Sequence, residues 1–458
     1  MIRVPSLSPG TAYKNRSLFL PKDKVSGAVL RGSLRFGEDS KGQPRVLVRE
    51  HCHHYEVPLH SFTEEQLVGF GCSPYIDLRP ESFQRVSIRP KESFSLRENQ
   101  EDAWDALRKA RKGILNLGCG RGKTVLGWLK ASHEQAPTLI VSPQKAHLEN
   151  WLIELEQFFD FSGTVGWVQG KKFQFDADIC LATVQTLARR AEEGRLPREF
   201  LTRFGLVIYD ECHCMAAEVF SKAADIGSGV RIGLSATPNR TDRCEGIFLS
   251  HLGPVFHSDI RQDLSPTFYV VDTGLFIRDS EYRRMIDKGG QVNVGLIRKE
   301  LARNPDRNAL IRQVIDSCIS EGRTLYVLSH SVDHVKLLHS VYPDSSLIHG
   351  GVKSDARLEQ LHGSDLVFAT IGVGKEAYNR KDLDTLLLLT PFAARSHSAI
   401  TLQQSVGRIQ RDHPGKKDPR VFLFLDSNID LCRGMIFSLV KEAKRGGYEV
   451  KRDWRPGI

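Results

Sequence analysis

Long apolar runs are absent from this chain, and so is an apolar leader. No stretch approaches the about 18 consecutive apolar residues that a helix needs to cross a bilayer. Residues 1–17 lack the apolar centre of a secretory signal peptide. We therefore expect no membrane span, no export and no membrane partner.

Paired cysteines are also lacking. The nine cysteines are an odd number and form no C-x-x-C pairs of the kind found in disulfide or zinc frameworks. We expect reduced thiols in a cytoplasmic protein. The run His51-Cys52-His53-His54 suggests metal ligands, but no second cluster follows at zinc-finger spacing, so a half-exposed strand is the better interpretation.

The chain does have an excess of positive charge. Its formal net charge is +9, and residues 1–50 hold 10 Lys and Arg against 4 Asp and Glu. This surplus favours an anionic partner such as nucleic acid. A length of 458 residues, 40% of them hydrophobic, predicts two or three globular domains.

The order of the apolar runs predicts how these domains are arranged. Short β-like runs such as residues 27–36 open the chain. Strands then alternate with helices from residue 113 to about 260 and again from 311 to about 430, which predicts parallel sheets. We expect five segments: a small basic β-containing N-terminal domain that contacts nucleic acid (1–92), a first α/β domain (93–262), a link with a possible helical insertion (263–310), a second α/β domain (311–430) and a basic C-terminal tail (431–458).

The stretch 114–127, ILNLGCGRGKTVLG, is the centre of the first α/β domain. An apolar strand leads into a glycine-rich loop, and a helix starts at Lys123 and Thr124. Glycines let backbone N–H groups point at an anion, and the helix start adds positive charge. Lys123 can reach the β- and γ-phosphates of ATP, and the Thr124 hydroxyl can bind Mg²⁺. The loop residues expected around the phosphates are Gly118, Cys119, Gly120, Arg121 and Gly122.

A second signal follows the apolar strand at 206–209, where the chain reads Asp210-Glu211-Cys212-His213. Asp210 is predicted to hold Mg²⁺ across from Thr124, and Glu211 to polarise the attacking water. The alternative is that the same Asp-Glu pair only caps a helix and supplies its acidic first turn. The position downstream of a phosphate loop favours the catalytic interpretation.

The second α/β domain has no phosphate loop, but its last helix is rich in Gln and Arg. Arg408 and Arg411 are three residues apart and so share a helix face. Two guanidinium groups from a second domain can stabilise the charge that develops on the γ-phosphate. The alternative is an exposed basic helix face that either binds a phosphate backbone or binds nothing.

Together these motifs resemble those of superfamily-2 helicases over roughly residues 94–427. The loop is similar to A-x-x-G-x-G-K-T with Leu117 in place of Ala, and residues 210–213 are similar to the D-E-x-H box. Gln404, Gly407, Arg408 and Arg411 match Q-x-x-G-R-x-x-R. The most similar members are UvsW-like phage recombination helicases and the branch-migration helicases of T-odd coliphages.

The resemblance implies two tandem RecA-like parallel-sheet domains that use ATP and Mg²⁺. It further implies an ATP-dependent DNA helicase or translocase that remodels forked or branched DNA, including Holliday junctions, in recombination, repair or replication. Recombination or replication proteins would be further partners, and the location would be the host cell cytoplasm if a phage encodes the chain.

The same resemblance assigns roles to further residues. Arg97 and Gln100 would read adenine, and Glu376 would lie near the nucleotide, although Ala377, Asn379 and Lys381 depart from that motif and put the usual sugar contact in doubt. Lys123, Glu211, Gln404, Arg408 and Arg411 would carry catalysis. His213, Ser235, Ala236 and Thr237 would couple hydrolysis to movement. Nucleic acid would contact the strand ends at Ser142, Pro143, Lys145, Thr183, Ser329, His330 and Thr370.

Three alternatives remain. An RNA helicase would share most of these motifs, although the D-E-C-H box differs from the common D-E-A-D pattern. The motor subunit of a restriction system would need a partner, because no nuclease segment is visible. An ATP-gated module that binds nucleic acid without unwinding it belongs to a different class, which intact hydrolysis residues disfavour.

Overall fold

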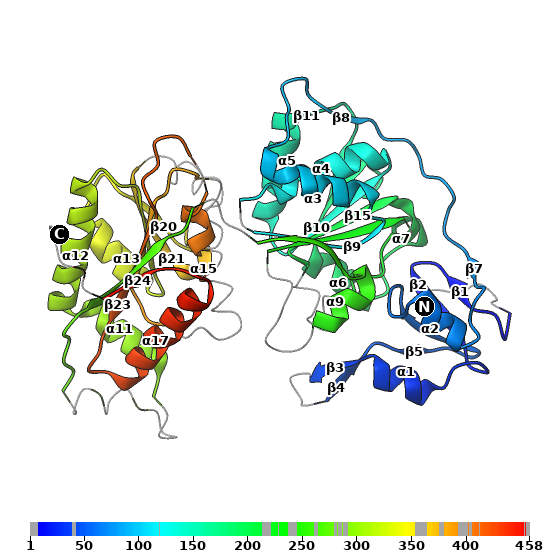
Figure 1. Cartoon of the computed structure of the whole chain (residues 1–458), viewed down its shortest axis with the longest axis horizontal. Helices are drawn as coiled ribbons and strands as arrows, with labels where there is room; N and C mark the ends of the chain where they lie inside the picture. The colour runs from blue at the N-terminus through cyan, green and yellow to red at the C-terminus, as the bar shows by residue number, and fades with distance from the viewer. Residues whose placement is uncertain are drawn as a thin grey trace. The chain divides into compact units, whose positions relative to one another are not determined.

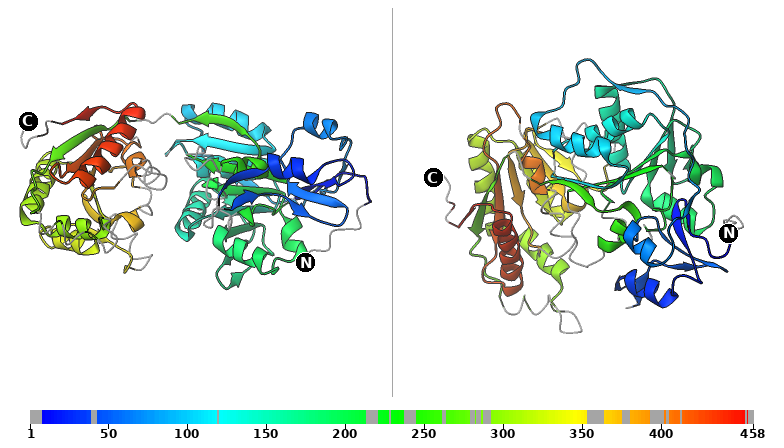
Figure 2. Two further views of the ribbon diagram at one scale, coloured as in Figure 1. Left: turned by 90° about the horizontal axis from the view of Figure 1, so that it is seen from below. Right: turned by 45° about the vertical axis from the view of Figure 1, so that its right-hand side comes forward.

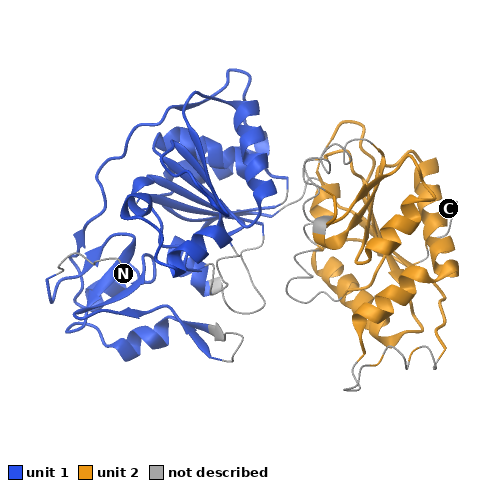
Figure 3. Cartoon of the chain, turned by 180° about the vertical axis from the view of Figure 1, so that it is seen from behind, with its two compact units in different colours: residues 1–261 blue, residues 262–458 orange. Residues whose placement is uncertain are grey.

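The structure is a computed structural model of the whole chain. It describes residues 8–38, 43–118, 120–212, 221–227, 229–236, 245–260, 264–278, 282, 286, 292–352, 364–374, 380–392, 402, 405–411, 413–452 and 454. The chain forms two compact units, Met1–Arg261 and Gln262–Ile458, coloured separately in Figure 3. No helix within the described ranges is both long and apolar enough to span a bilayer.

The first unit is built on an eight-stranded sheet in which every neighbouring pair is parallel except β12 and β13. Its inner strands are continuous apolar runs because both faces are covered, as parallel sheets require. The order across the sheet is β13 (Lys172–Phe173), β12 (Val165–Gln169), β14 (Ile179–Thr183), β10 (Thr138–Ser142), β15 (Leu206–Asp210), β16 (Val230–Ser235), β9 (Lys112–Leu117) and β17 (Val255–Asp259).

Helices cover both faces of this sheet. Alternate strand residues point to opposite faces, so Leu139 and Val141 belong to one core and Ile140 to the other. Figure 1 shows α3 (Glu98–Lys109), α4 (Lys123–Glu134) and α5 (Lys145–Phe158) on one side, and α6 (Val184–Glu192) and α9 (Glu245–Leu252) on the other. The short helix α7 (Arg198–Arg203) packs into the same core as α6 and α9.

Residues 8–38 and 43–77 form a small sheet of their own with a separate core. Its strand order is β5 (Arg49–Glu50), β6 (His54–Pro58), β2 (Ser17–Pro21), β1 (Tyr13–Lys14) and β7 (Ile76–Asp77). A hairpin of β3 (Arg35–Glu38) and β4 (Pro44–Val46) and the helix α2 (Glu64–Gly69) complete it. The strand pair β8 (Ile88–Pro90) and β11 (Phe159–Phe161) instead packs on the α/β part, because Ile88 and Phe159 lie in its core.

One expectation for this region is wrong. Residues 27–36 were expected to be a strand, but α1 occupies Gly27–Ser33 and β3 begins only at residue 35. The hydroxyl oxygen of Ser26 accepts a hydrogen bond from the N–H of Ala28 at 3.3 Å and caps the helix. Leu30 then points into the core of the small sheet.

The small sheet is firmly attached to the α/β part of the first unit, and the views in Figure 2 show the two side by side. Arg16 donates a hydrogen bond to the carbonyl of Asp225 at 2.8 Å, and Arg231 donates one to the carbonyl of Arg16 at 2.7 Å. The backbone N–H of His60 donates to the carbonyl of Ser250 at 2.9 Å. These contacts brace the first α/β domain.

The second unit is a seven-stranded sheet whose neighbouring strands are all parallel. The order is β20 (Ser346–Ile348), β21 (Leu366–Thr370), β19 (Leu325–Ser329), β22 (Thr385–Leu388), β23 (Arg420–Leu425), β18 (Thr267–Asp272) and β24 (Val450–Lys451). Helices α12 (Pro305–Ser320) and α13 (Val332–His339) pack on one face and α17 (Asp430–Arg445) on the other, with α11 (Val294–Arg303) and the short α15 (Ile371–Gly374) beside them.

Two expected segments are integral to this second sheet. The expected link, 263–310, supplies β18, which pairs with β23 over six residues. The expected basic tail, 431–458, supplies most of α17 and the edge strand β24. Strands β18 and β24 are far along the chain from the strands they pair with, so the local pattern of apolar residues could not predict that they belong to this sheet.

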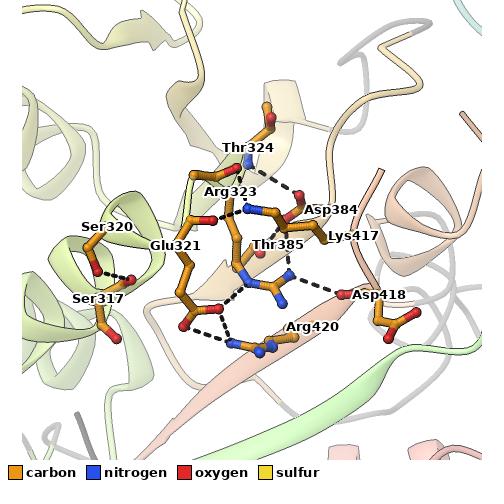
Figure 4. Close-up of polar contacts among 11 residues, drawn as sticks. Ser317, Ser320, Glu321, Arg323, Thr324, Asp384, Thr385, Lys417, Asp418 and Arg420 are labelled. Carbon is orange, nitrogen blue, oxygen red and sulfur yellow. Dashed lines mark hydrogen bonds and ion pairs between the residues drawn. The ribbon is translucent and has the colours of Figure 1, made fainter. Parts of the chain in front are cut away.

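A charged cluster joins the amino ends of β19, β22 and β23 (Figure 4). Glu321 accepts hydrogen bonds from Arg323 at 2.9 Å and from Arg420 at 2.8 Å, and Arg323 lies 3.4 Å from Asp384. Burial raises the pKa of Glu321, but the hydrogen bonds from Arg323 and Arg420 outweigh it and leave that pKa below its ordinary value. Because the strands are parallel, their carboxyl ends lie at the opposite edge.

Candidate functional site

The glycine-rich loop lies between β9 and α4 with two glycines in a left-handed conformation. The φ angle is 82° at Gly120 and 76° at Gly122, values that favour glycine. Between them, the buried Arg121 lies 3.7 Å from the buried carboxylate of Asp259 at the end of β17. Gly122 is the N-cap of α4 and offers no side-chain cap, so the first N–H groups of the helix can face an anion. Cys119 lies outside the described residues.

Gln100, on α3, packs directly on this loop. Its amide N–H donates to the carbonyl of Arg121 at 3.1 Å, and its amide oxygen accepts from the backbone N–H of Arg97 at 3.1 Å. A Cβ added at Gly122 would lie 2.0 Å from the amide nitrogen of Gln100. The structure therefore brings the buried Gln100 to the loop, while Arg97 is exposed at the start of α3 and bonds to Gln100 through its backbone N–H.

Lys123 and Thr124 begin α4. The ammonium of Lys123 donates to the carbonyl of Leu117 at 3.1 Å and lies 3.5 Å from that of Gly118. The N–H of Gly118 donates to the carbonyl of Asp259 at 2.9 Å, which ties the loop to β17. Thr124 is half-buried on the first turn. Lysine and threonine thus stand at the open end of the helix.

Asp210 ends β15, which pairs with β10 on one side and β16 on the other. One carboxylate oxygen of Asp210, Oδ2, accepts hydrogen bonds from the Ser142 hydroxyl at 3.3 Å and the Trp151 indole N–H at 3.2 Å. The Nδ1 atom of His147 lies 4.0 Å from the same oxygen. Glu211 follows with a φ of 50°, a left-handed conformation that is uncommon for a residue other than glycine. Such local strain often occurs at functional sites.

The electrostatics of Asp210 reflect its surroundings. Burial raises its pKa most, and the charge of Glu211 raises it further. His147, the indole of Trp151 and the ammonium of Lys123 act in the opposite direction without cancelling the rise. A carboxylate held in this way gains from a nearby cation.

The predicted coupling residues are placed in part. Ser235 ends β16, is fully buried, and pairs in register with Asn116 of β9. Ala236 follows it at the same edge of the sheet. His213 and Thr237 lie outside the described residues.

In the second unit, the residues predicted to act on the γ-phosphate lie after β22. Residues 405–409 are helical, and Ile409 packs into the core below β22 and β23. Arg408 and Arg411 are half-buried on this segment. Gln404 and Glu376 lie outside the described residues.

Four of the seven predicted nucleic-acid contacts form two equivalent pairs. Ser142 and Thr183 are in register on β10 and β14, and Ser329 and Thr370 are in register on β19 and β21. Both serine side chains are fully buried and both threonines are 7% exposed. The Ser142 hydroxyl is bound to Asp210, and that of Ser329 lies 3.1 Å from Nδ1 of His334. In this conformation both serine hydroxyls are engaged within the protein, and their contact with nucleic acid stays a prediction.

The exposed groups at these edges come from the residues that follow the strands. Lys145 is exposed and pairs with Glu149 on the next turn of α5. Pro143 is half-buried. His330 is exposed and hydrogen-bonds through Nδ1 to the hydroxyl of Thr390 at 2.7 Å.

Sequence reasoning missed two kinds of residue at the edge of the first sheet where the glycine-rich loop lies. Asp259 comes from β17, a strand that was not expected beside β9. His147 and Trp151 are four residues apart on α5 and so share a helix face. That spacing was visible, but it does not reveal that the face meets Asp210.

Comparisons with known proteins show what the chain is similar to. Residues 93–240 match the family model "Type III restriction enzyme, res subunit". A putative ATP-dependent RNA helicase of Acanthamoeba polyphaga mimivirus is 25% identical over 78% of this chain and 69% of its own length. The DNA 3'-5' helicase XPB of Mycobacterium tuberculosis is 28% identical, over 48% of this chain and 43% of its own length. A probable helicase of Escherichia phage T5, D10, is 24% identical over 72% of this chain and 71% of its own length.

Solved structures establish the fold. Dbp5 of S. cerevisiae, bound to RNA and ADP BeF3, matches with a TM-score of 0.54 at 11% identity, over 78% of this chain and 89% of that one. The Mycobacterium smegmatis helicase Lhr, bound to ssDNA and AMP-PNP, matches with a TM-score of 0.51 at 19% identity, over 77% of this chain and 48% of that one. The chain has two tandem RecA-like domains. The predicted fold class is confirmed.

Proposed function

We propose that this chain is an ATP-dependent nucleic-acid helicase or translocase. The observation that carries the proposal is the shared edge of the first sheet, where the start of α4 with Lys123 and Thr124 meets the end of β15 with Asp210 and Glu211. In open α/β sheets, ligands bind outside the carboxyl ends of the strands. Relatives that are named helicases, and that this chain matches over most of their length, support the same activity.

The residues present fit a nucleotide with Mg²⁺. The helix start, which has no side-chain cap, and the left-handed glycines of the loop suit a phosphate chain. Thr124 and Asp210 offer the hard oxygen ligands that Mg²⁺ prefers. Within the described ranges, no three His, Cys, Asp or Glu side chains gather as a metal cage. Mg²⁺ is commonly bound by one or two carboxylates, phosphates and water, and when bound it would neutralise charge on the phosphates.

The protein groups then have distinct tasks. Lys123 would exchange the carbonyls of Leu117 and Gly118 for phosphate oxygens. Glu211 would polarise the attacking water and accept its proton. Arg97 and Gln100 would contact adenine while Gln100 keeps its bond to the loop.

We propose that the second unit supplies the remaining catalytic charges. Arg408 and Arg411, with Gln404, would stabilise the γ-phosphate in the transition state. Glu376 would contribute near the nucleotide. Ser235, Ala236, Thr237 and His213 would transmit hydrolysis to the nucleic-acid edge.

For the substrate we propose DNA, in particular forked or four-way junctions. The basic surplus of the first 50 residues supports an anionic partner, and the motif pattern resembles that of DNA-remodelling helicases. Exposed groups after the strand ends, including Lys145 and His330, would contact the backbone. RNA is the competing substrate, because several relatives with broad coverage are named putative ATP-dependent RNA helicases.

The test is the steady-state ATPase rate at one low salt concentration. It is measured without nucleic acid and with single-stranded DNA, duplex DNA, a four-way junction or structured RNA. We expect the junction to stimulate best and to lose labelled strands as ATP is consumed. Because general-base catalysis contributes about 10²–10⁴-fold, Glu211→Gln should abolish most of the turnover.

The outcomes separate the alternatives. Stimulation by RNA alone would replace DNA as the substrate. ATPase activity that no nucleic acid stimulates would leave an ATP-gated binding module. Stimulation by DNA should weaken steeply as salt increases, because backbone contacts release counterions.

A further inference from the structure

The indole of Trp151 makes a contact that the proposed mechanism leaves unexplained. Trp151 is 1% exposed, in the middle of α5, and its N–H donates to Oδ2 of Asp210 at 3.2 Å. Indole N–H is a donor only, so a buried tryptophan needs an acceptor. Here that acceptor is the carboxylate proposed to hold Mg²⁺.

The space for this indole is built into α4. Gly127 lies one turn after Thr124, and a Cβ added there would lie 2.4 Å from the ring of Trp151. The ring of Trp128, on the same helix, meets that of Trp151 edge to face at a centroid distance of 5.3 Å, and its N–H donates to the carbonyl of Trp151 at 2.9 Å. Trp151 is therefore wedged between the helix that carries Lys123 and the strand that carries Asp210.

The hydrogen bonds to Asp210 are one-sided. The hydroxyl of Ser142 and the indole of Trp151 both approach Oδ2. No hydrogen bond from the described part of the chain reaches the other oxygen, Oδ1. Two donors on one oxygen fix the rotation of the carboxylate.

We propose that Trp151 is a positioning residue for Asp210. Its N–H, together with the Ser142 hydroxyl, holds Oδ2 and leaves Oδ1 as the oxygen presented to Mg²⁺. This inference rests on the proposed function. Because Ser142 ends β10, the strand that leads into the exposed Lys145, the same pair of bonds connects the metal-binding carboxylate to the proposed nucleic-acid edge.

Trp128 provides a matched control. Trp151→Phe and Trp128→Phe each remove one buried indole N–H from the same pair of rings, but only the first removes a bond to Asp210. Loss of a group that orients a metal ligand typically costs 10–100-fold in metal affinity. We expect Trp151→Phe to raise the Mg²⁺ concentration for half-maximal ATPase at least about tenfold, and Trp128→Phe to leave it within about threefold.

A readout without turnover uses intrinsic fluorescence. Addition of Mg²⁺ and a non-hydrolysable ATP analogue should change the tryptophan emission of the wild type and of Trp128→Phe, and that change should be lost in Trp151→Phe. Should Trp151→Phe fail to fold, Ser142→Ala removes the other bond to Oδ2 and should also shift the Mg²⁺ dependence upward.

Failure of this inference differs from failure of the proposed function. Equal Mg²⁺ dependence of the two Trp→Phe variants, with the emission change retained in Trp151→Phe, would overturn the inference while the ATPase remains sensitive to Lys123→Ala. If Lys123→Ala leaves hydrolysis unchanged, the nucleotide site itself is misassigned, and the inference is overturned with it.

Discussion

A single buried ion pair shows how much one residue can contribute to the second unit. Arg307 and Asp426 are fully buried, with Nε of Arg307 2.8 Å from Oδ1 of Asp426, and the Thr273 hydroxyl donates to the same oxygen at 2.7 Å. Removal of one partner leaves a buried charge without compensation, which costs about 3–5 kcal/mol. We predict that Asp426→Ala lowers the free energy of unfolding by about that amount, measured by urea unfolding followed by circular dichroism.

The same substitution at an exposed pair is the control for this prediction. Asp430 lies 2.6 Å from Arg433, but the side chains are 84% and 48% exposed. Exposed pairs contribute about 0–1 kcal/mol, so Asp430→Ala should change stability little. A loss for Asp426→Ala no larger than that for Asp430→Ala would contradict the prediction.

At the scale of the helix, two glycines show how helix propensity and side-chain packing can have opposite effects on a Gly→Ala substitution. Alanine at an exposed helix-interior glycine gains about 1 kcal/mol. Gly434 in α17 has nothing within 4 Å of its would-be Cβ, whereas that of Gly127 in α4 would meet the Trp151 ring at 2.4 Å. Overpacking costs about 1–3 kcal/mol. We predict that Gly434→Ala stabilises the protein and Gly127→Ala destabilises it, measured by thermal and urea unfolding.

Opposite signs are the essential result, because a propensity effect alone would raise stability in both variants. The indole of Trp151 cannot move far without breaking its bond to Asp210. Equal stabilisation by the two changes would mean that α4 and α5 separate readily.

The helices and strands also show how much of the fold the sequence could predict. The strands at 138–142, 206–210 and 230–235 follow from uninterrupted apolar runs between turn signals, and the phosphate loop follows from its glycines. The partners of each strand are not encoded locally. Asp259 reaches the loop from β17, and β18 and β24 join a sheet whose other strands are far away along the chain. Burial of Ser142 against Asp210 likewise depends on tertiary packing.

For the whole molecule, the titration of buried groups predicts that acid destabilises the fold. His334 is 1% exposed and hydrogen-bonds through Nε2 to Asn308 at 2.9 Å and through Nδ1 to Ser329 at 3.1 Å. Burial, with the nearby charge of Arg307, lowers the pKa of His334 to about 3. The unfolded chain binds this proton near the ordinary value of about 6.5, so it takes up more protons than the folded chain between pH ~6.5 and ~3.

Stability should therefore fall as the pH falls through that window, by about 1.4 kcal/mol per pH unit for this histidine. Carboxylates add to the loss at lower pH. Burial raises the pKa of Asp225, but the charges of His251, Arg49 and Arg231 outweigh it and hold that pKa below its ordinary value. Its contribution is present above pH ~4 and is lost as the pH falls further.

The urea midpoint measured from pH 7 to pH 4.5 tests the buried histidines, because the carboxylates are still largely ionised there. His60, whose pKa is lowered to about 2 chiefly by burial, adds to the slope in the same window. His334→Gln should remove about 1.4 kcal/mol per pH unit from the slope in that range, whereas His53→Gln, at an exposed position, should leave the slope unchanged. A slope in His334→Gln equal to that of the wild type would contradict the prediction, whereas a reduced slope is expected to remain because of His60.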